Sequence, residues 1–132
     1  MTVLAPYPDA ELVMMDLLQP VAPTVTATDQ TLTGRTIQIQ RVGGTDDGVT
    51  DRPVLQVTCM ATTRTEAWAM ARDVQQRVLA AGGTAVTGTR VAGVYIDSTR
   101  TVTPPDQLPD RNPGIRPVSA QYRLGLRRPR PT

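Results

Sequence analysis

The sequence contains no histidine, no lysine and no phenylalanine, and only one of its 132 residues is a cysteine. Histidine is the commonest general base and zinc ligand, so its absence argues against enzymes that depend on either role. A single cysteine cannot form a disulfide within the chain, which fits a reducing compartment. Aromatic residues make up 3% of the chain, which is too few for a surface that stacks nucleic-acid bases.

Long apolar runs are also missing. A membrane span needs about 20 consecutive apolar residues, and Asp16 interrupts the best candidate, residues 12–18. No basic region precedes an apolar stretch near the N-terminus, so we expect no signal peptide and no membrane partner. The length suits a single domain over residues 1–132.

The charge that is present is unusual in kind and in distribution. All 14 basic residues are arginine, which we attribute to a GC-rich genome rather than to a mechanism. Residues 1–63 hold seven acidic residues and three arginines, a net charge of −4, whereas residues 64–132 hold five and eleven, a net charge of +6. Such a split can set the orientation in which copies or partners meet.

Two segments have the signals of amphipathic helices. Residues 10–18 follow a Pro-Asp pair, and their apolar side chains recur at helical spacing. Residues 63–81 form the longer predicted helix. Thr63 or Thr65 can cap it, Thr63 and Glu66 have the spacing of a capping box, and a Gly-Gly pair follows the last turn.

Four segments have the alternation of strands. Residues 36–42 and 54–61 are separated by a polar, glycine-containing loop, which predicts an antiparallel hairpin. Residues 91–103 and 118–127 form a second pair, and the latter alternates between apolar and polar side chains. The connection over residues 104–117 contains five prolines, so we expect it to be irregular.

The predicted order is therefore α-β-β-α-β-β. We expect an α+β fold: a four-stranded, largely antiparallel or mixed sheet with two helices packed on one face. The other face would be polar or would meet a partner.

No group of residues has the pattern of a catalytic or metal site. Cys59 lies on the apolar face of a strand, which favours packing over nucleophilic chemistry. Asp46, Asp47 and Asp51 lack the alternating acids and closing glutamate of a calcium loop, so we interpret them as a solvated loop tip. The motifs of nucleotide-binding loops and nucleophile elbows are absent. We predict that the chain is not an enzyme and that it holds no cofactor and no metal ion.

Two further features could contact a partner. The arginine-rich tail, residues 127–132, includes Arg127, Arg128 and Arg130, and we expect it to be loose. It could neutralise phosphates, but the scarcity of aromatics argues against specific nucleic-acid recognition. Trp68 lies beside the alanine stripe of the longer helix, where a partly buried core position or an interface anchor would both suit it.

Five short stretches, spread over nearly the whole chain, carry a family resemblance. They are PDAEL at residues 8–12, RVGG at 41–44, DRPVLQV at 51–57, TEAWAMAR at 65–72 and QYRL at 121–124. In order and spacing they resemble the tail terminator proteins of long-tailed bacteriophages (siphoviruses), particularly those that infect actinobacteria. The arginine-only composition agrees with such a host.

The resemblance implies a virion structural protein rather than an enzyme. Members of the family form a homo-oligomer, a hexameric ring, at the head-proximal end of the tail tube. The ring stops polymerisation of the tail tube protein and presents a surface to a head-completion or neck protein. Genomic DNA would pass through its lumen without sequence-specific binding. The expected location is the virion, in the tail or neck, and the host cytoplasm during assembly.

The charge split suggests which residues meet neighbouring subunits. We expect the acidic loop at residues 43–52 and the arginine-rich C-terminus to make these contacts, so the candidate contact residues are Asp46, Asp47, Trp68, Arg127, Arg128 and Arg130. Two alternatives stay open: another neck component such as a head-completion or stopper protein, and a small nucleic-acid-binding regulator that uses the arginine tail.

Overall fold

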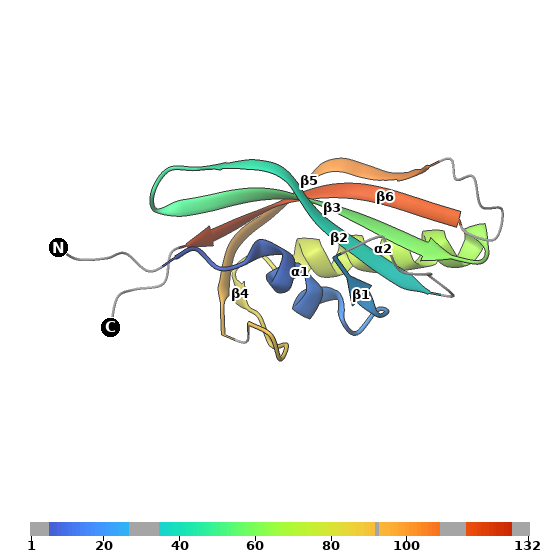
Figure 1. The fold of residues 1–132 in the computed structure, drawn as a ribbon, viewed down its shortest axis with the longest axis horizontal. Coiled ribbons are helices and arrows are strands. Elements are labelled where there is room, and N and C mark those ends of the chain that lie inside the picture. Colours follow the sequence, from blue (N-terminus) through green and yellow to red (C-terminus); the bar gives the residue numbers. More distant parts are fainter. Residues whose placement is uncertain (1–5, 27–34, 92, 109–115, 128–132) are drawn as a thin grey trace.

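A computed structural model describes residues 6–26, 35–91, 93–108 and 116–127. It contains two helices and six strands within these residues (Figure 1). In chain order they are α1 (Ala10–Leu18), β1 (Thr24–Val25), β2 (Thr36–Asp46), β3 (Thr50–Ala61), α2 (Arg64–Ala80), β4 (Thr84–Ala85), β5 (Tyr95–Gln107) and β6 (Arg116–Arg127). Both predicted helices and both predicted hairpins are present.

The prediction of a four-stranded α+β sheet is wrong. The strands form one six-stranded mixed sheet in the order β1-β2-β3-β6-β5-β4, curled into a half-barrel, and the chain is mostly β. β1 pairs with β2 in parallel, and every other pairing is antiparallel. The two additional strands, β1 and β4, have two residues each. Strands this short show no alternation, so the sequence pattern contains no signal for them.

The proline-rich connection is also shorter and more regular than predicted. β5 begins at Tyr95 and continues to Gln107, through Pro104 and Pro105. The register between β5 and β6 shifts between Thr103 and Asp106, so the two prolines lie in a bulge. Proline is tolerated at bulges because its missing N–H is not needed by the ladder there.

The hairpin formed by β2 and β3 is longer than the sequence indicated. The pair Gly43-Gly44 lies within β2, where the register shifts between Arg41 and Gly43, and the turn itself is at residues 47–49. Gly44 has φ +119°, and a Cβ there would clash with the carbonyl oxygen of Arg52. Residues 41–54, which we call the hairpin arm, extend beyond both helices (Figure 1).

Capping side chains begin both helices. The Asp9 carboxylate accepts hydrogen bonds from the N–H groups of Glu11 and Leu12, at 3.0 and 3.3 Å. The Thr63 hydroxyl accepts one from the N–H of Glu66 at 3.2 Å, so Thr63 and not Thr65 is the cap. These bonds satisfy N–H groups that have no partner within the helix.

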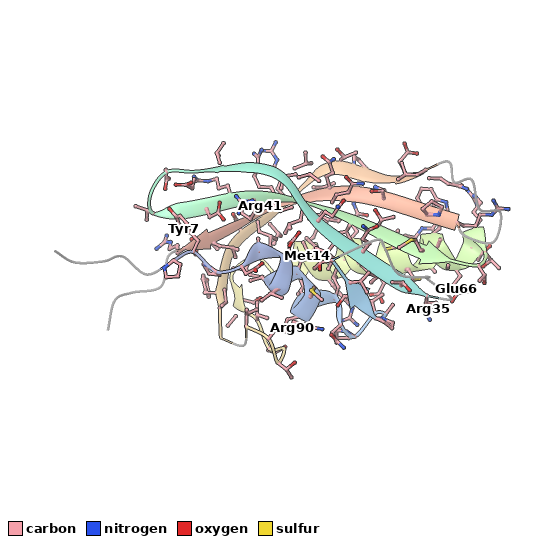
Figure 2. The ribbon with its side chains drawn as sticks, viewed as in Figure 1. Tyr7, Met14, Arg35, Arg41, Glu66 and Arg90 are labelled. Atoms are coloured by element: carbon pink, nitrogen blue, oxygen red, sulfur yellow. The ribbon has the colours of Figure 1, made fainter. Side chains whose placement is uncertain are left out.

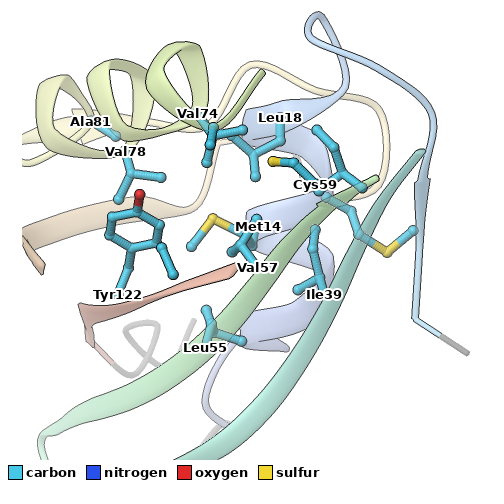
Figure 3. Packing of buried hydrophobic residues seen from close by; sticks show 14 of the residues in the cluster. Met14, Leu18, Ile39, Leu55, Val57, Cys59, Val74, Val78, Ala81 and Tyr122 are labelled. Atoms are coloured by element: carbon cyan, nitrogen blue, oxygen red, sulfur yellow. The ribbon is translucent and has the colours of Figure 1, made fainter. Parts of the chain in front are cut away.

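The core lies between the sheet and the two helices (Figure 3). Its largest fully buried side chains are Tyr122, Met14, Leu18, Ile37, Ile39, Leu55, Met70, Ile96, Leu124, Leu126, Val13 and Val57. Cys59 belongs to the same cluster, and burial raises the pKa of its thiol to about 12. The predicted packing role of Cys59 is confirmed.

A buried carboxylate fastens the segment before β5 to α1. Asp16, on α1, accepts hydrogen bonds from the N–H groups of Arg90 and Val91 at 2.9 and 2.7 Å, and the Arg90 guanidinium lies 3.2 Å from its other oxygen. A Cβ at Gly88 would clash with the Asp16 side chain. Asp16 therefore organises a loop that is distant in sequence.

Tyr122 provides a test of the core packing. Its side chain is fully buried with the hydroxyl directed toward α2 near Val78 and Ala81 (Figure 3), and this hydroxyl has no hydrogen-bond partner among the described residues. A buried hydroxyl without a partner costs about 1–3 kcal/mol. We expect Tyr122→Phe to leave the free energy of unfolding unchanged or to raise it by about 1 kcal/mol, measured by urea unfolding. A loss of more than about 1 kcal/mol would contradict the unpaired state of this hydroxyl.

Candidate functional site

A hollow of about 470 Å³ lies where the N-terminal segment meets the hairpin arm. It is lined by Tyr7, Pro8, Asp9, Ala10, Glu11, Arg41, Asp46 and Asp51. Four carboxylates surround one guanidinium, so we call this hollow the acidic pocket. Figure 2 shows Tyr7 and Arg41 at this place.

Arg41 makes hydrogen bonds that connect the parts of the acidic pocket. Its guanidinium makes two hydrogen bonds of 2.8 Å to the buried carboxylate of Asp51. The hydrogen bond to Asp51 raises the pKa of Arg41. The backbone N–H of Arg41 donates to Glu11 at 3.0 Å, and the Tyr7 hydroxyl donates to Asp46 at 3.5 Å. The pocket therefore links α1 and the N-terminal segment to the hairpin arm.

The predicted contact residues Asp46 and Asp47 lie at the tip of the hairpin arm and build its turn. Asp47 accepts hydrogen bonds from the N–H groups of Thr50 and Val49 at 2.8 and 2.9 Å, and Arg52 lies 3.2 Å away. These hydrogen bonds lower the pKa of Asp47 to about 2. Asp46 accepts from the N–H of Gly48 at 3.1 Å. Both aspartates are exposed at the end of a projecting element.

The aspartates of the hairpin arm were also compared with the pattern of a metal site. No cluster of three or more potential ligand side chains occurs within the described residues. Asp51, the third aspartate of the predicted acidic loop, forms an ion pair with Arg41.

The sheet face that points away from the helices carries a second hollow, of about 320 Å³. It is lined by Arg52, Ser98, Thr99, Arg100, Arg123 and Leu124, and we call it the arginine groove. Sequence reasoning placed Arg123 on the polar face of its strand but did not single out this cluster. The cluster depends on the register that sets Arg100 opposite Arg123.

The other predicted contact residues are spread over the molecule. Trp68 is partly buried against the core, and the Arg64 guanidinium lies 5.7 Å from its ring centroid. Arg127, at the end of β6, is mostly exposed and pairs with Asp97 at 2.6 Å. Arg128 and Arg130 lie outside the described residues. The structure thus brings Asp46 and Asp47 together and places Arg127 opposite Thr50, next to their turn, whereas Trp68 lies on α2.

Within the described residues, no helix is long and apolar enough to cross a membrane.

The chain was compared with known structures and with known sequence families. The fold is similar to a chain of a solved structure described as "Virion of native gene transfer agent (GTA) particle", with a TM-score of 0.54 and 12% sequence identity over 89% of this chain and 87% of that chain. At that identity the likeness shows the fold alone. No curated protein matches the sequence. Residues 6–132 match the family model described as "Phage tail termination protein". Because this match covers nearly the whole sequence, the chain belongs to the phage tail termination protein family.

Proposed function

We propose that the protein caps the head-proximal end of the tail tube as a hexameric ring. Membership of its family makes it a phage tail structural protein of the virion. In the proposed role the ring terminates polymerisation of the tail tube protein and forms the tail-side surface of the head–tail junction. A head-completion or neck protein would bind that surface, and genomic DNA would pass through the lumen. The subunit would be present in the host cytoplasm during assembly and would catalyse no reaction. The actinobacterial host stays a prediction.

The observation that supports assembly is that both long edges of the sheet are open. On its outer side β2 pairs with β1 only at Ile37 and Gln38, and β5 pairs with β4 only at Tyr95 and Ile96. The rest of each outer edge has no strand beside it within the described residues. An isolated protein usually protects such edges, because their free N–H and C=O groups pair with other chains.

The two open edges belong to different strands, β2 and β5, on opposite sides of the sheet, so one edge of a subunit can meet the other edge of the next. Contacts between unlike surfaces form a closed ring when the rotation between subunits closes. The hairpin arm adds to the argument, because residues 41–49 are all exposed in the isolated subunit. We further propose that Asp46, Asp47, Trp68, Arg127, Arg128 and Arg130 include subunit or partner contacts.

Light scattering coupled to size exclusion tests this function. We expect a species of about six times the subunit mass, either alone or after the tail tube protein is added, because a ring that closes has a fixed number of subunits. A subunit that stays monomeric in both conditions would contradict the proposal. An oligomer that binds a head-side protein and ignores the tube would instead indicate another neck component.

A further inference from the structure

Two arginines face each other directly on the sheet. Arg100 on β5 and Arg123 on β6 are register partners, and both side chains are exposed. Like charges at directly opposed positions destabilise a sheet. No carboxylate of the described residues forms an ion pair with either of them. The isolated subunit therefore bears an electrostatic cost that an external anion would remove.

The surroundings of this pair favour an anion with more than one oxygen. Arg52 is a third guanidinium of the arginine groove, and the Ser98 and Thr99 residues line the same hollow. Arg52 forms an ion pair with Asp47 at 3.2 Å. This pair neutralises one of the three guanidinium charges, so the groove keeps an excess of positive charge. Carboxylates match guanidinium groups in geometry and charge.

The hairpin arm supplies carboxylates at the end of a projecting element. Asp46 and Asp47 are both exposed at its tip, and next to them Val49 is 63% exposed. Val42 is 47% exposed, so docking of the arm tip on another molecule would bury apolar as well as charged side chains.

A chain cannot bring its own Asp46 to its own arginine groove. Asp46 is the register partner of Asp51, on the sheet face that the helices cover, whereas Thr45 and Arg52 form the neighbouring pair on the other face. Successive residues of a strand point to opposite faces. Asp46 therefore lies on the wrong side of the sheet, and the acid that meets Arg100 and Arg123 must come from another chain.

We propose that the arginine groove of one subunit receives the tip of the hairpin arm of a second copy, with Asp46 of that copy against Arg100 and Arg123. This inference rests on the proposed ring and gives its contacts a direction, head to tail. It is also a different assignment from Arg127, Arg128 and Arg130, because Arg100 and Arg123 lie inside β5 and β6 and not in the tail at residues 127–132.

Charge reversal tests the contact. We expect R100E/R123E to raise the protein concentration needed for assembly by at least about tenfold, because close charge pairs across an interface contribute that much or more. The matched control is R72E/R116E, which makes the same change of charge at two other exposed arginines. The triple variant R100E/R123E/D46R restores opposite charges across the contact, and we expect it to regain assembly.

Disulfide trapping tests the same contact without reversing charge. We expect D46C/R100C to form bonds between subunits under mild oxidation, and D46C/R72C to form none. The native Cys59 is buried in the core, so it does not compete in this experiment.

Each outcome decides between the proposals. If R100E/R123E assembles like the unmodified protein and D46C/R100C forms no bond between subunits, the groove contact is wrong while the ring stands. If the unmodified protein never assembles, even with the tail tube protein, both proposals fail. If R100E/R123E assembles normally but loses retention of a short DNA duplex at low salt, the groove binds phosphates instead.

Discussion

Replacing Asp16 by alanine is expected to lower the free energy of unfolding by about 3–5 kcal/mol. The Asp16 side chain is 1% exposed and accepts two backbone N–H groups and the Arg90 guanidinium. The variant leaves these donors without their acceptor, and a charge that loses its partner in a buried place is costly. Urea unfolding at about pH 7 measures the effect.

Asp73→Ala is the matched control for this prediction. Asp73 also pairs with an arginine, Arg77, at 3.2 Å, but both side chains are largely exposed on α2. Exposed pairs at this spacing contribute about 0.3–0.5 kcal/mol. If Asp16→Ala cost no more than Asp73→Ala, the segment at residues 86–94 would not depend on the buried carboxylate.

The same carboxylate makes stability depend on pH. Burial acts to raise the pKa of Asp16, but the hydrogen bonds from Val91 and Arg90 outweigh burial and hold the pKa below its ordinary value. A lowered pKa in the folded state means that the stabilisation is complete above the unfolded pKa of about 3.9 and is lost as the pH falls through the folded pKa. The difference in stability between the unmodified protein and Asp16→Ala should therefore shrink in acid, below about pH 4.

Replacing Leu124 by alanine is expected to cost about 2–5 kcal/mol of unfolding free energy. Leu124 is fully buried on β6, the strand that lies between β3 and β5, and β6 packs against α2. Removing three carbons there leaves a cavity that the sheet and helix cannot both close. Urea unfolding with an unchanged denaturant slope would show that stability, and not compactness, has changed.

Val102→Ala provides the comparison for Leu124. Val102 is on the neighbouring strand β5 and is 42% exposed. We expect it to cost less than about 1 kcal/mol, because surface substitutions usually change stability by about 0.5 kcal/mol or less. Similar costs for the two variants would mean that the core does not lie where the structure puts it.

The elements that the sequence predicted are those whose signal is local. The longer helix has a capping residue, Thr63, and an apolar stripe, so it begins within one residue of its predicted start. β6 ends at the predicted residue, Arg127, but begins two residues earlier than predicted, at Arg116, and Ser119 on the side predicted to be polar is buried. Local signals of this kind do not depend on which partner the element meets.

What the sequence could not predict depends on contacts between distant residues. β1 is a strand because its two residues pair with β2, and β4 because its two residues pair with β5. Gly43-Gly44 has the composition of a turn, but it lies in a bulge that only the pairing with β3 defines. Tertiary pairing here overrides local preference.

The residues of the candidate site also fall into those that local sequence indicated and those that depend on distant contacts. Asp46 and Asp47 were identified because an acidic, glycine-containing loop between two strands is visible in the sequence. The arginine groove was missed because it needs the register of β5 against β6. Asp16 was seen only as an interruption of an apolar run, because its partner Arg90 is 74 residues away.

The hairpin arm also has a consequence for how the subunit unfolds. Residues 41–46 on the β2 side of the arm pair only with β3, whereas the β3 side also pairs with β6 as far as Thr50 and Arg127, and Arg41 binds Asp51 and Glu11. The β2 side and the turn, residues 41–49, are exposed, and exposed segments of this kind open locally at a lower cost than global unfolding. Local opening of the free subunit is therefore expected along residues 41–49, and docking of the tip on another chain would suppress it, as slower amide hydrogen exchange there would show.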